Sequence, residues 1–108
     1  MAKIEQMLIF NTTFHVEDKV RDAYLEYMKL LYIPKAVSSG FLQVLSFAHI
    51  HSQHGEQGTS YALQFRVKNS DTLDYWMKNE GESLRHEIGI KFGENVLAFV
   101  TILEEIEF

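Results

Sequence analysis

Hydrophobic and polar positions first alternate along the chain and then recur at helical spacing. Residues 4–14 are apolar at almost every second position, which predicts a strand with apolar side chains on both faces. Asp18 opens a stretch in which apolar side chains recur on one helical stripe, so we predict a first helix over residues 18–31. Pro34 disfavours helical geometry at Ile33, so we expect a kink there, after which a short helical turn restarts and is closed by Gly40.

The second half repeats this order of patterns. Residues 41–51 and 59–68 alternate as two strands joined by a polar hairpin loop. Ser70 is a good N-cap for a second helix, whose end is predicted by Phe92-Gly93. Residues 96–108 read as a long last strand that becomes acidic toward its end.

The predicted order is strand, helix, strand, strand, helix, strand, which is typical of an α+β domain of the ferredoxin-like type, β-α-β-β-α-β. Residues 1–108 would form a single domain in which both helices cover one face of a four-stranded antiparallel sheet. Apolar residues of both parities in the last strand, such as Phe99 and Val100, would leave the other face apolar as well. A second copy of the sheet is the simplest cover, so we predict a homodimer that forms an α/β barrel.

Composition narrows the choice of partners. The chain of 108 residues has a formal net charge of -5, and its basic residues are scattered, which argues against nucleic-acid binding. It contains no cysteine, so disulfides, thiolate nucleophiles and zinc sites of the Cys type are excluded. The apolar run at residues 7–10 is far shorter than a signal peptide or a membrane span, and we expect a cytoplasmic protein without a membrane partner.

Short motifs are spread over nearly the entire chain. They are residues 11–18, Tyr24-Leu25-Glu26-Tyr27-Met28, Ile33-Pro34, Gly40, Leu84-Arg85, Lys91-Phe92-Gly93, Ala98-Phe99 and Leu103-Glu104. In these motifs the chain resembles the DUF4286 family of small bacterial proteins, which have no assigned function. The resemblance implies the dimeric α/β-barrel superfamily, with its monooxygenase-like enzymes, haem-handling proteins and ligand-binding regulators. The chain departs from the family pattern at Tyr32, where His is usual, and at Tyr24, where Trp is usual.

Polar side chains recur on the strand face that we expect to point away from the helices. Asn11 and Thr13 on the first strand share this parity with Gln64 and Arg66 on the third strand. A few convergent polar groups in an apolar enclosure are typical of a ligand site. Hydrogen bonds among themselves, to water or across a dimer interface are the simpler explanation.

Helical residues add to this candidate site. Arg85 would clamp a carboxylate or phosphate, because its planar guanidinium bonds two oxygens at once, but pairing with a local Glu is an equal alternative. Tyr24, Tyr27, Tyr32 and Trp76 would line the space between helices and sheet, although aromatic residues at helical spacing are more often core. The predicted ligand-binding residues are Asn11, Tyr24, Gln64, Arg66, Trp76 and Arg85.

Histidines gather at the end of the second predicted strand. His49 and His51 would lie on the same side of the strand about 6.5–7 Å apart, close enough to converge on one metal ion. A third ligand would come from His54 or Glu56 in the loop. Isolated pairs of this kind are weak motifs, so we favour a polar strand end in solvent and predict no metal and no cofactor.

Sequence motifs for familiar chemistry are absent from the chain. It has no Gly-rich phosphate loop, nucleophile elbow or haem-attachment motif. The leading hypothesis is a homodimeric small-molecule-binding protein. One alternative is a cofactor-free monooxygenase- or isomerase-like enzyme in which Asn11, Tyr24, His49 or Trp76 positions the substrate. The other alternative is a non-catalytic oligomerisation module.

Overall fold

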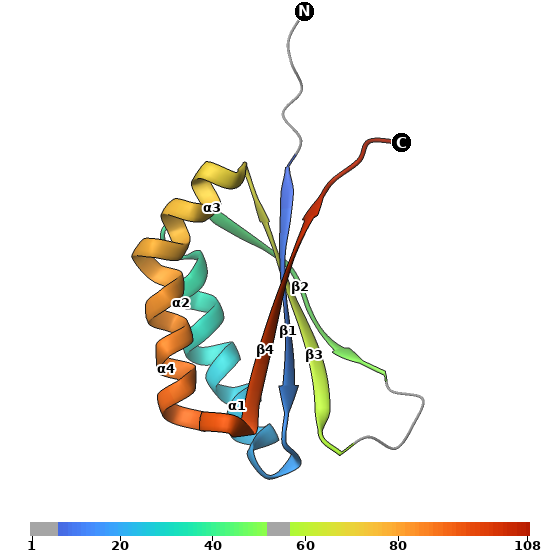
Figure 1. Ribbon diagram of the computed structural model, residues 1–108, viewed down its shortest axis with the longest axis vertical. Helices are drawn as coiled ribbons and strands as arrows, with labels where there is room; N and C mark the ends of the chain where they lie inside the picture. Colours follow the sequence, from blue (N-terminus) through green and yellow to red (C-terminus); the bar gives the residue numbers. More distant parts are fainter. Residues whose placement is uncertain (1–6, 52–56) are drawn as a thin grey trace, which may run out of the picture.

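The computed structural model, which describes residues 7–51 and 57–108, contains one antiparallel sheet with helices on one face (Figure 1). Its four strands lie in the order β2-β3-β1-β4. Their bounds are Leu8–Val16 for β1, Leu42–Ile50 for β2, Thr59–Val67 for β3 and Val96–Glu104 for β4. The prediction of a ferredoxin-like β-α-β-β-α-β fold is therefore confirmed.

Alternation along the two central strands decides which side chains enter the core. On β1, Phe10 and Phe14 are buried beneath the helices, and Phe10 lies opposite Phe65 of β3. Residues directly opposite one another in antiparallel strands share a face, so Asn11 and its partner Gln64 point to the other side. We call the side that carries no helix the outer face of the sheet.

Strands β1, β2 and β4 differ in detail from the predicted strands. Strand β1 begins at Leu8 and continues to Val16, two residues beyond the expected end. Strand β4 ends at Glu104 rather than Phe108. Strand β2 also contains an irregularity between Val44 and Ser46, which shifts the parity of its side chains.

The first helical region continues through the proline. It consists of η1 (Asp18–Val20), α1 (Arg21–Tyr27), the π-helical segment η2 (Met28–Tyr32) and α2 (Ile33–Val37). The expectation that Ile33 would leave the helix is wrong, since its φ of -63° and ψ of -47° are helical. Proline cannot donate the usual helical hydrogen bond, and the wider π turn directly before Pro34 accommodates that loss without ending the helix.

The second helical region is built in the same way. It consists of α3 (Ser70–Trp76), the π-helical segment η3 (Met77–Gly81), α4 (Glu82–Phe92) and the short η4 (Gly93–Asn95). Its N-cap is Asn69 rather than the predicted Ser70, because the Asn69 side chain accepts a hydrogen bond from the Thr72 backbone N–H at 2.9 Å. Gly93, with a φ of 56°, ends α4 as expected.

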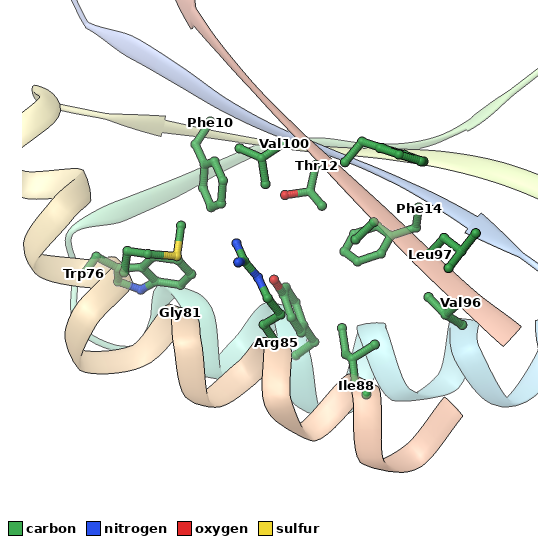
Figure 2. A pocket seen from close by; sticks show the side chains of 15 residues that line it. Phe10, Thr12, Phe14, Trp76, Gly81, Arg85, Ile88, Val96, Leu97 and Val100 are labelled. Atoms are coloured by element: carbon green, nitrogen blue, oxygen red, sulfur yellow. The ribbon is translucent and has the colours of Figure 1, made fainter. Parts of the chain in front are cut away.

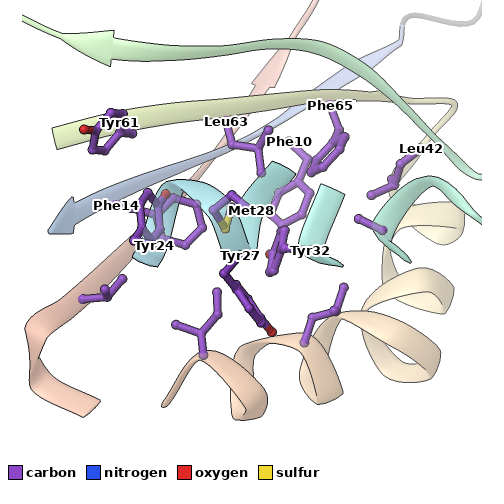
Figure 3. Close-up of a cluster of buried hydrophobic side chains, with 14 of the residues drawn as sticks. Phe10, Phe14, Tyr24, Tyr27, Met28, Tyr32, Leu42, Tyr61, Leu63 and Phe65 are labelled. Atoms are coloured by element: carbon purple, nitrogen blue, oxygen red, sulfur yellow. The ribbon is translucent and has the colours of Figure 1, made fainter. Parts of the chain in front are cut away.

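The core lies between the helices and the inner face of the sheet (Figure 3). Its largest fully buried side chains are aromatic, and Phe14 packs against Tyr24 with ring centroids 5.6 Å apart. The indole N–H of Trp76 donates a buried hydrogen bond to the backbone oxygen of Ala36 at 2.9 Å, which ties the two helical regions together. Within the described part of the chain, no helix is long and apolar enough to cross a membrane.

Candidate functional site: a cavity between α4 and the sheet

A cavity of about 590 Å³ lies between the second helical region and strands β1 and β4 (Figure 2). Strand β1 supplies Phe10, Thr12 and Phe14, and the helical regions supply Tyr32, Trp76, Met77, Gly81, Arg85, Ile88 and Gly89. Residues 96–100 of the edge strand β4 form its remaining wall. The volume falls in the range of small-molecule sites in proteins, about 300–1,000 Å³.

Rigid aromatic rings form one end of the cavity. Trp76 meets Phe10 edge to face, with ring centroids 5.7 Å apart, and its hydrogen bond to Ala36 fixes the orientation of the indole. Gly81 allows this close packing because a Cβ atom there would lie 2.7 Å from the indole ring. The shape of this wall is therefore determined before any ligand arrives.

The two π-helical segments both contribute to the cavity. Tyr32 is the last residue of η2, and Met77 and Gly81 are the first and last residues of η3. Single π turns inside α-helices are frequent at functional sites, because they change the direction of side chains without ending the helix. Here they bring side chains from both helical regions to the same cavity.

Three polar side chains face the otherwise apolar space. Arg85 extends from α4 toward the sheet between Trp76 and Thr12 (Figure 2). Burial raises the pKa of Tyr32 to about 12, and the nearby Arg85 guanidinium opposes part of that rise. The Tyr32 hydroxyl therefore stays protonated at neutral pH and can donate a hydrogen bond.

The side chains that line the cavity carry a positive charge and no negative charge. No Asp, Glu or His is among the residues that line it. The ion pairs of the described chain are Arg21–Asp22, Lys35–Glu87 and Arg66–Glu105, so Arg85 pairs with no carboxylate in residues 7–51 and 57–108. An unpaired guanidinium beside an apolar surface provides an attractive position for an anion.

The model of the family described as "Domain of unknown function (DUF4286)" matches residues 7–106. The chain belongs to the DUF4286 family. This confirms the resemblance found in the sequence motifs, and the match includes all residues that line the cavity. No curated protein matches this DUF4286 chain.

Several solved structures share the fold of this DUF4286 domain. An EthD family protein from Bacillus halodurans is 17% identical with a TM-score of 0.71, and the alignment covers 92% of this chain and 99% of that one. A NipSnap family protein of unknown function from Agrobacterium tumefaciens is 11% identical with a TM-score of 0.71, covering 98% and 94%. A dimeric ferredoxin-like protein from an uncultured marine organism is 9% identical with a TM-score of 0.54, covering 96% and 99%. At these identities the similarity establishes the fold alone.

The predicted ligand-binding residues lie on both sides of the sheet. Trp76 and Arg85 line the cavity, whereas Asn11, Gln64 and Arg66 point to the outer face. Arg66 is paired with Glu105, with its Nη2 atom 2.7 Å from the carboxylate. The expectation that all these residues surround one cavity is wrong, because the backbone of the sheet separates the two groups.

Tyr24 belongs to neither group. It is fully buried among rings that include Phe14 and Tyr61, and it does not line the cavity. Its hydroxyl has no hydrogen-bond partner among the described residues, neither Asn11 nor Arg85. Burial accordingly raises the pKa of Tyr24, since the charged phenolate would be unsolvated there.

The histidine pair lies at the exposed end of β2. The rings of His49 and His51 are 5.1 Å apart between centroids, as expected for two residues on one side of a strand. Within the described residues no group of three potential metal ligands is present. His54 and Glu56, the remaining candidates, lie outside the described residues.

Sequence reasoning missed Thr12, Met77 and Gly81 as cavity residues. Thr12 stands at a core-facing position of β1 and is 4% exposed. The signal available in the sequence was the hydroxyl of this threonine, which stands within a run of aromatic core positions. Nothing in the local sequence around Met77 and Gly81 indicates a π turn or the close approach of Gly81 to Trp76.

Proposed function

We propose that this protein is a homodimer that binds a small molecule in the cavity between α4 and the sheet. The observation that carries the proposal is a cavity of about 590 Å³ with rigid aromatic walls and a few inward polar groups. The space opens along β4, where Leu97 and Phe99 are exposed, so a ligand can reach it from solvent. A pure oligomerisation module would not need polar groups such as Thr12 and Arg85 along this space, and it is therefore less favoured.

The apolar outer face supports the dimer. Its edge strand β4 carries Phe99, which is 63% exposed, together with the exposed Leu97 and Leu103. Exposed apolar surface over one whole strand is typical of an interface rather than of a monomer surface. The described relative from a marine organism is named as a dimeric ferredoxin-like protein, which agrees with this proposal.

Binding is favoured over catalysis because of the groups that line the cavity. General base catalysis near neutral pH uses a side chain such as His, Asp or Glu, and none of these lines it. Thr12, Tyr32 and Arg85 are suited to donating hydrogen bonds. A cofactor-free enzyme remains the second reading, in which the protonated Tyr32 would position the substrate.

Native mass spectrometry on protein purified without a His tag tests the binding proposal. We expect a dimer mass accompanied by a reproducible small-molecule adduct that is released on unfolding. A protein that carries no adduct, and whose Trp76 fluorescence responds to none of a panel of apolar acids, amides and alcohols, would contradict it. The only tryptophan of the chain lines the cavity, so its emission reports on this site.

A matched pair of variants tests the dimer separately. Leu103→Lys places a charge on the outer face next to Glu105, away from the cavity, and Ile90→Lys places the same charge on the exposed surface of α4. In sedimentation velocity at micromolar concentration, we expect Leu103→Lys to be monomeric and Ile90→Lys to remain dimeric. A monomeric wild-type protein would refute the dimer but leave the cavity proposal standing.

A further inference from the structure

We propose that the ligand is a monocarboxylate with a flat apolar body, whose carboxylate is bound by Arg85 and whose body lies against Phe10 and Trp76. The inference rests on the proposed binding function and specifies the chemical class of the ligand. It is drawn from the charge, the donors and the shape of the cavity.

The charge of the site selects an anion. Arg85 is the only residue lining the cavity that is charged at neutral pH, and it has no ion-pair partner within residues 7–51 and 57–108. A ligand with a single negative charge would neutralise it, whereas a second negative charge would find no further counter-ion among the lining residues. Arg85 is exposed, so this preference rests on charge pairing and not on burial.

The donors favour a carboxylate. A guanidinium offers two parallel N–H groups, which match the two oxygens of a carboxylate. The Tyr32 hydroxyl lies in the same cavity within electrostatic reach of Arg85, and Thr12 contributes a further hydroxyl from β1. Together these groups can satisfy the lone pairs of one carboxylate that has left water.

The walls select the rest of the molecule. Beyond the polar groups, the cavity is lined by Phe10, Phe14, Trp76, Ile88 and Val100, which offer no further hydrogen bonds from their side chains other than the indole N–H. That N–H is already bonded to the Ala36 carbonyl. Aromatic faces and edges held in fixed positions favour a flat, apolar partner over a flexible polar one.

Fluorescence titration with two matched probes tests the proposal on the full chain. 4-Phenylbutanoate and 4-phenylbutanamide have nearly the same shape, but only the first carries a charge. We expect Trp76 emission to change with both compounds and the carboxylate to bind at least about tenfold more tightly, the usual effect of a charge-assisted hydrogen bond. Acetate and inorganic phosphate, which lack the apolar body, should produce no saturable change at millimolar concentration.

Four variants at three arginines identify the guanidinium that binds the carboxylate. Arg85→Gln should weaken 4-phenylbutanoate about tenfold to a hundredfold and leave 4-phenylbutanamide unchanged, while Arg85→Lys should restore part of the preference. Arg21→Gln, on the exposed surface of the first helical region, is the neutral control. Arg66→Gln removes the guanidinium on the outer face and should have no effect either.

The outcomes separate this inference from the proposed function. Equal binding of the two probes would overturn the monocarboxylate and leave a ligand cavity. If the preference for 4-phenylbutanoate over 4-phenylbutanamide is lost in Arg66→Gln and kept in Arg85→Gln, the role of Arg85 is refuted. The anion site would then lie on the outer face. If phosphate alone saturates the site, the apolar body is refuted. If no probe binds, the monocarboxylate is refuted, and the adduct measured by native mass spectrometry decides separately whether the binding proposal stands.

Discussion

Two glycines of the second helical region allow the packing around the cavity to be measured by one pair of substitutions. Gly81 and Gly89 both have helical backbone geometry, and alanine is favoured over glycine in a helix by about 1 kcal/mol. This gain is common to both sites, so the difference between Gly81→Ala and Gly89→Ala isolates the effect of the added methyl group. At Gly89 that methyl group would have no atom within 4 Å.

At Gly81 the same methyl group meets two side chains. The new Cβ would lie 2.6 Å from the sulfur of Met77 and 2.7 Å from the indole of Trp76. Met77 can change rotamer, but Trp76 is 1% exposed and held by its hydrogen bond to Ala36. Overpacking of this kind costs about 1–3 kcal/mol, which exceeds or cancels the helical gain.

We therefore expect Gly89→Ala to raise the free energy of unfolding by about 0.5–1 kcal/mol. The free energy of unfolding of Gly81→Ala should be about 1–3 kcal/mol lower than that of Gly89→Ala. Urea unfolding followed by circular dichroism measures both, and the second variant should unfold roughly 1 M earlier than the first. All proteins are compared at one protomer concentration, because a dimer's stability depends on it. A Gly81→Ala protein as stable as Gly89→Ala would refute the close packing of Trp76 against η3.

Two tyrosines yield further predictions. Tyr24→Phe removes a buried hydroxyl that has no partner among the described residues, so stability should stay level or rise by up to about 1 kcal/mol in urea unfolding, and a loss larger than that would reveal a hidden hydrogen bond. Tyr32 has a pKa of about 12 in the folded protein against an ordinary value of 10.0, so between these pH values the folded state holds a proton that the unfolded state has lost. Stability should be fully retained below pH 10 and fall by about 2–3 kcal/mol toward pH 12, since each pKa unit corresponds to about 1.36 kcal/mol. Urea unfolding at pH 9 and pH 11.5 measures this loss of stability. Tyr32→Phe should reduce the loss, and Tyr75→Phe, at an exposed position, should not. Equal losses of stability in both variants would contradict the assignment of the effect to Tyr32.

Periodicity in the sequence was sufficient for the fold. Alternation from Phe10 to Phe14 and from Tyr61 to Val67 correctly identified the central strands and the residues that face the helices. The error at Ile33 has a physical cause, because the steric clash with the proline ring only disfavours helical angles at the preceding residue and does not forbid them. Ile33 keeps helical angles, and the helical region continues through the π turn of η2 into α2.

The site was harder to predict than the fold. The alternation of the strands correctly placed Asn11 and Gln64 on the same face of the sheet, and helical spacing placed Trp76 near the sheet. The sequence does not indicate which polar side chains line the same cavity. The sheet separates Asn11 from Arg85, so residues that looked convergent are on opposite faces. The cavity forms where both helical regions meet β1 and β4, which is a result of how the helices pack on the sheet.

The π turn of η3 also holds one residue more than the orientation of the following helix requires. A turn that closes between residues five apart holds one more residue than an α turn, and each residue of an α-helix advances the side chains by about 100°. Deleting one residue from Met77–Gly81 would therefore leave an ordinary α turn, with α4 still presenting Arg85 to the cavity. Deleting one residue between Gly81 and Arg85, where no π turn holds a spare residue, would instead rotate Arg85 by about 100°. The chain can thus lose one codon in η3 and keep the charge in the cavity, but it cannot lose one at the start of α4.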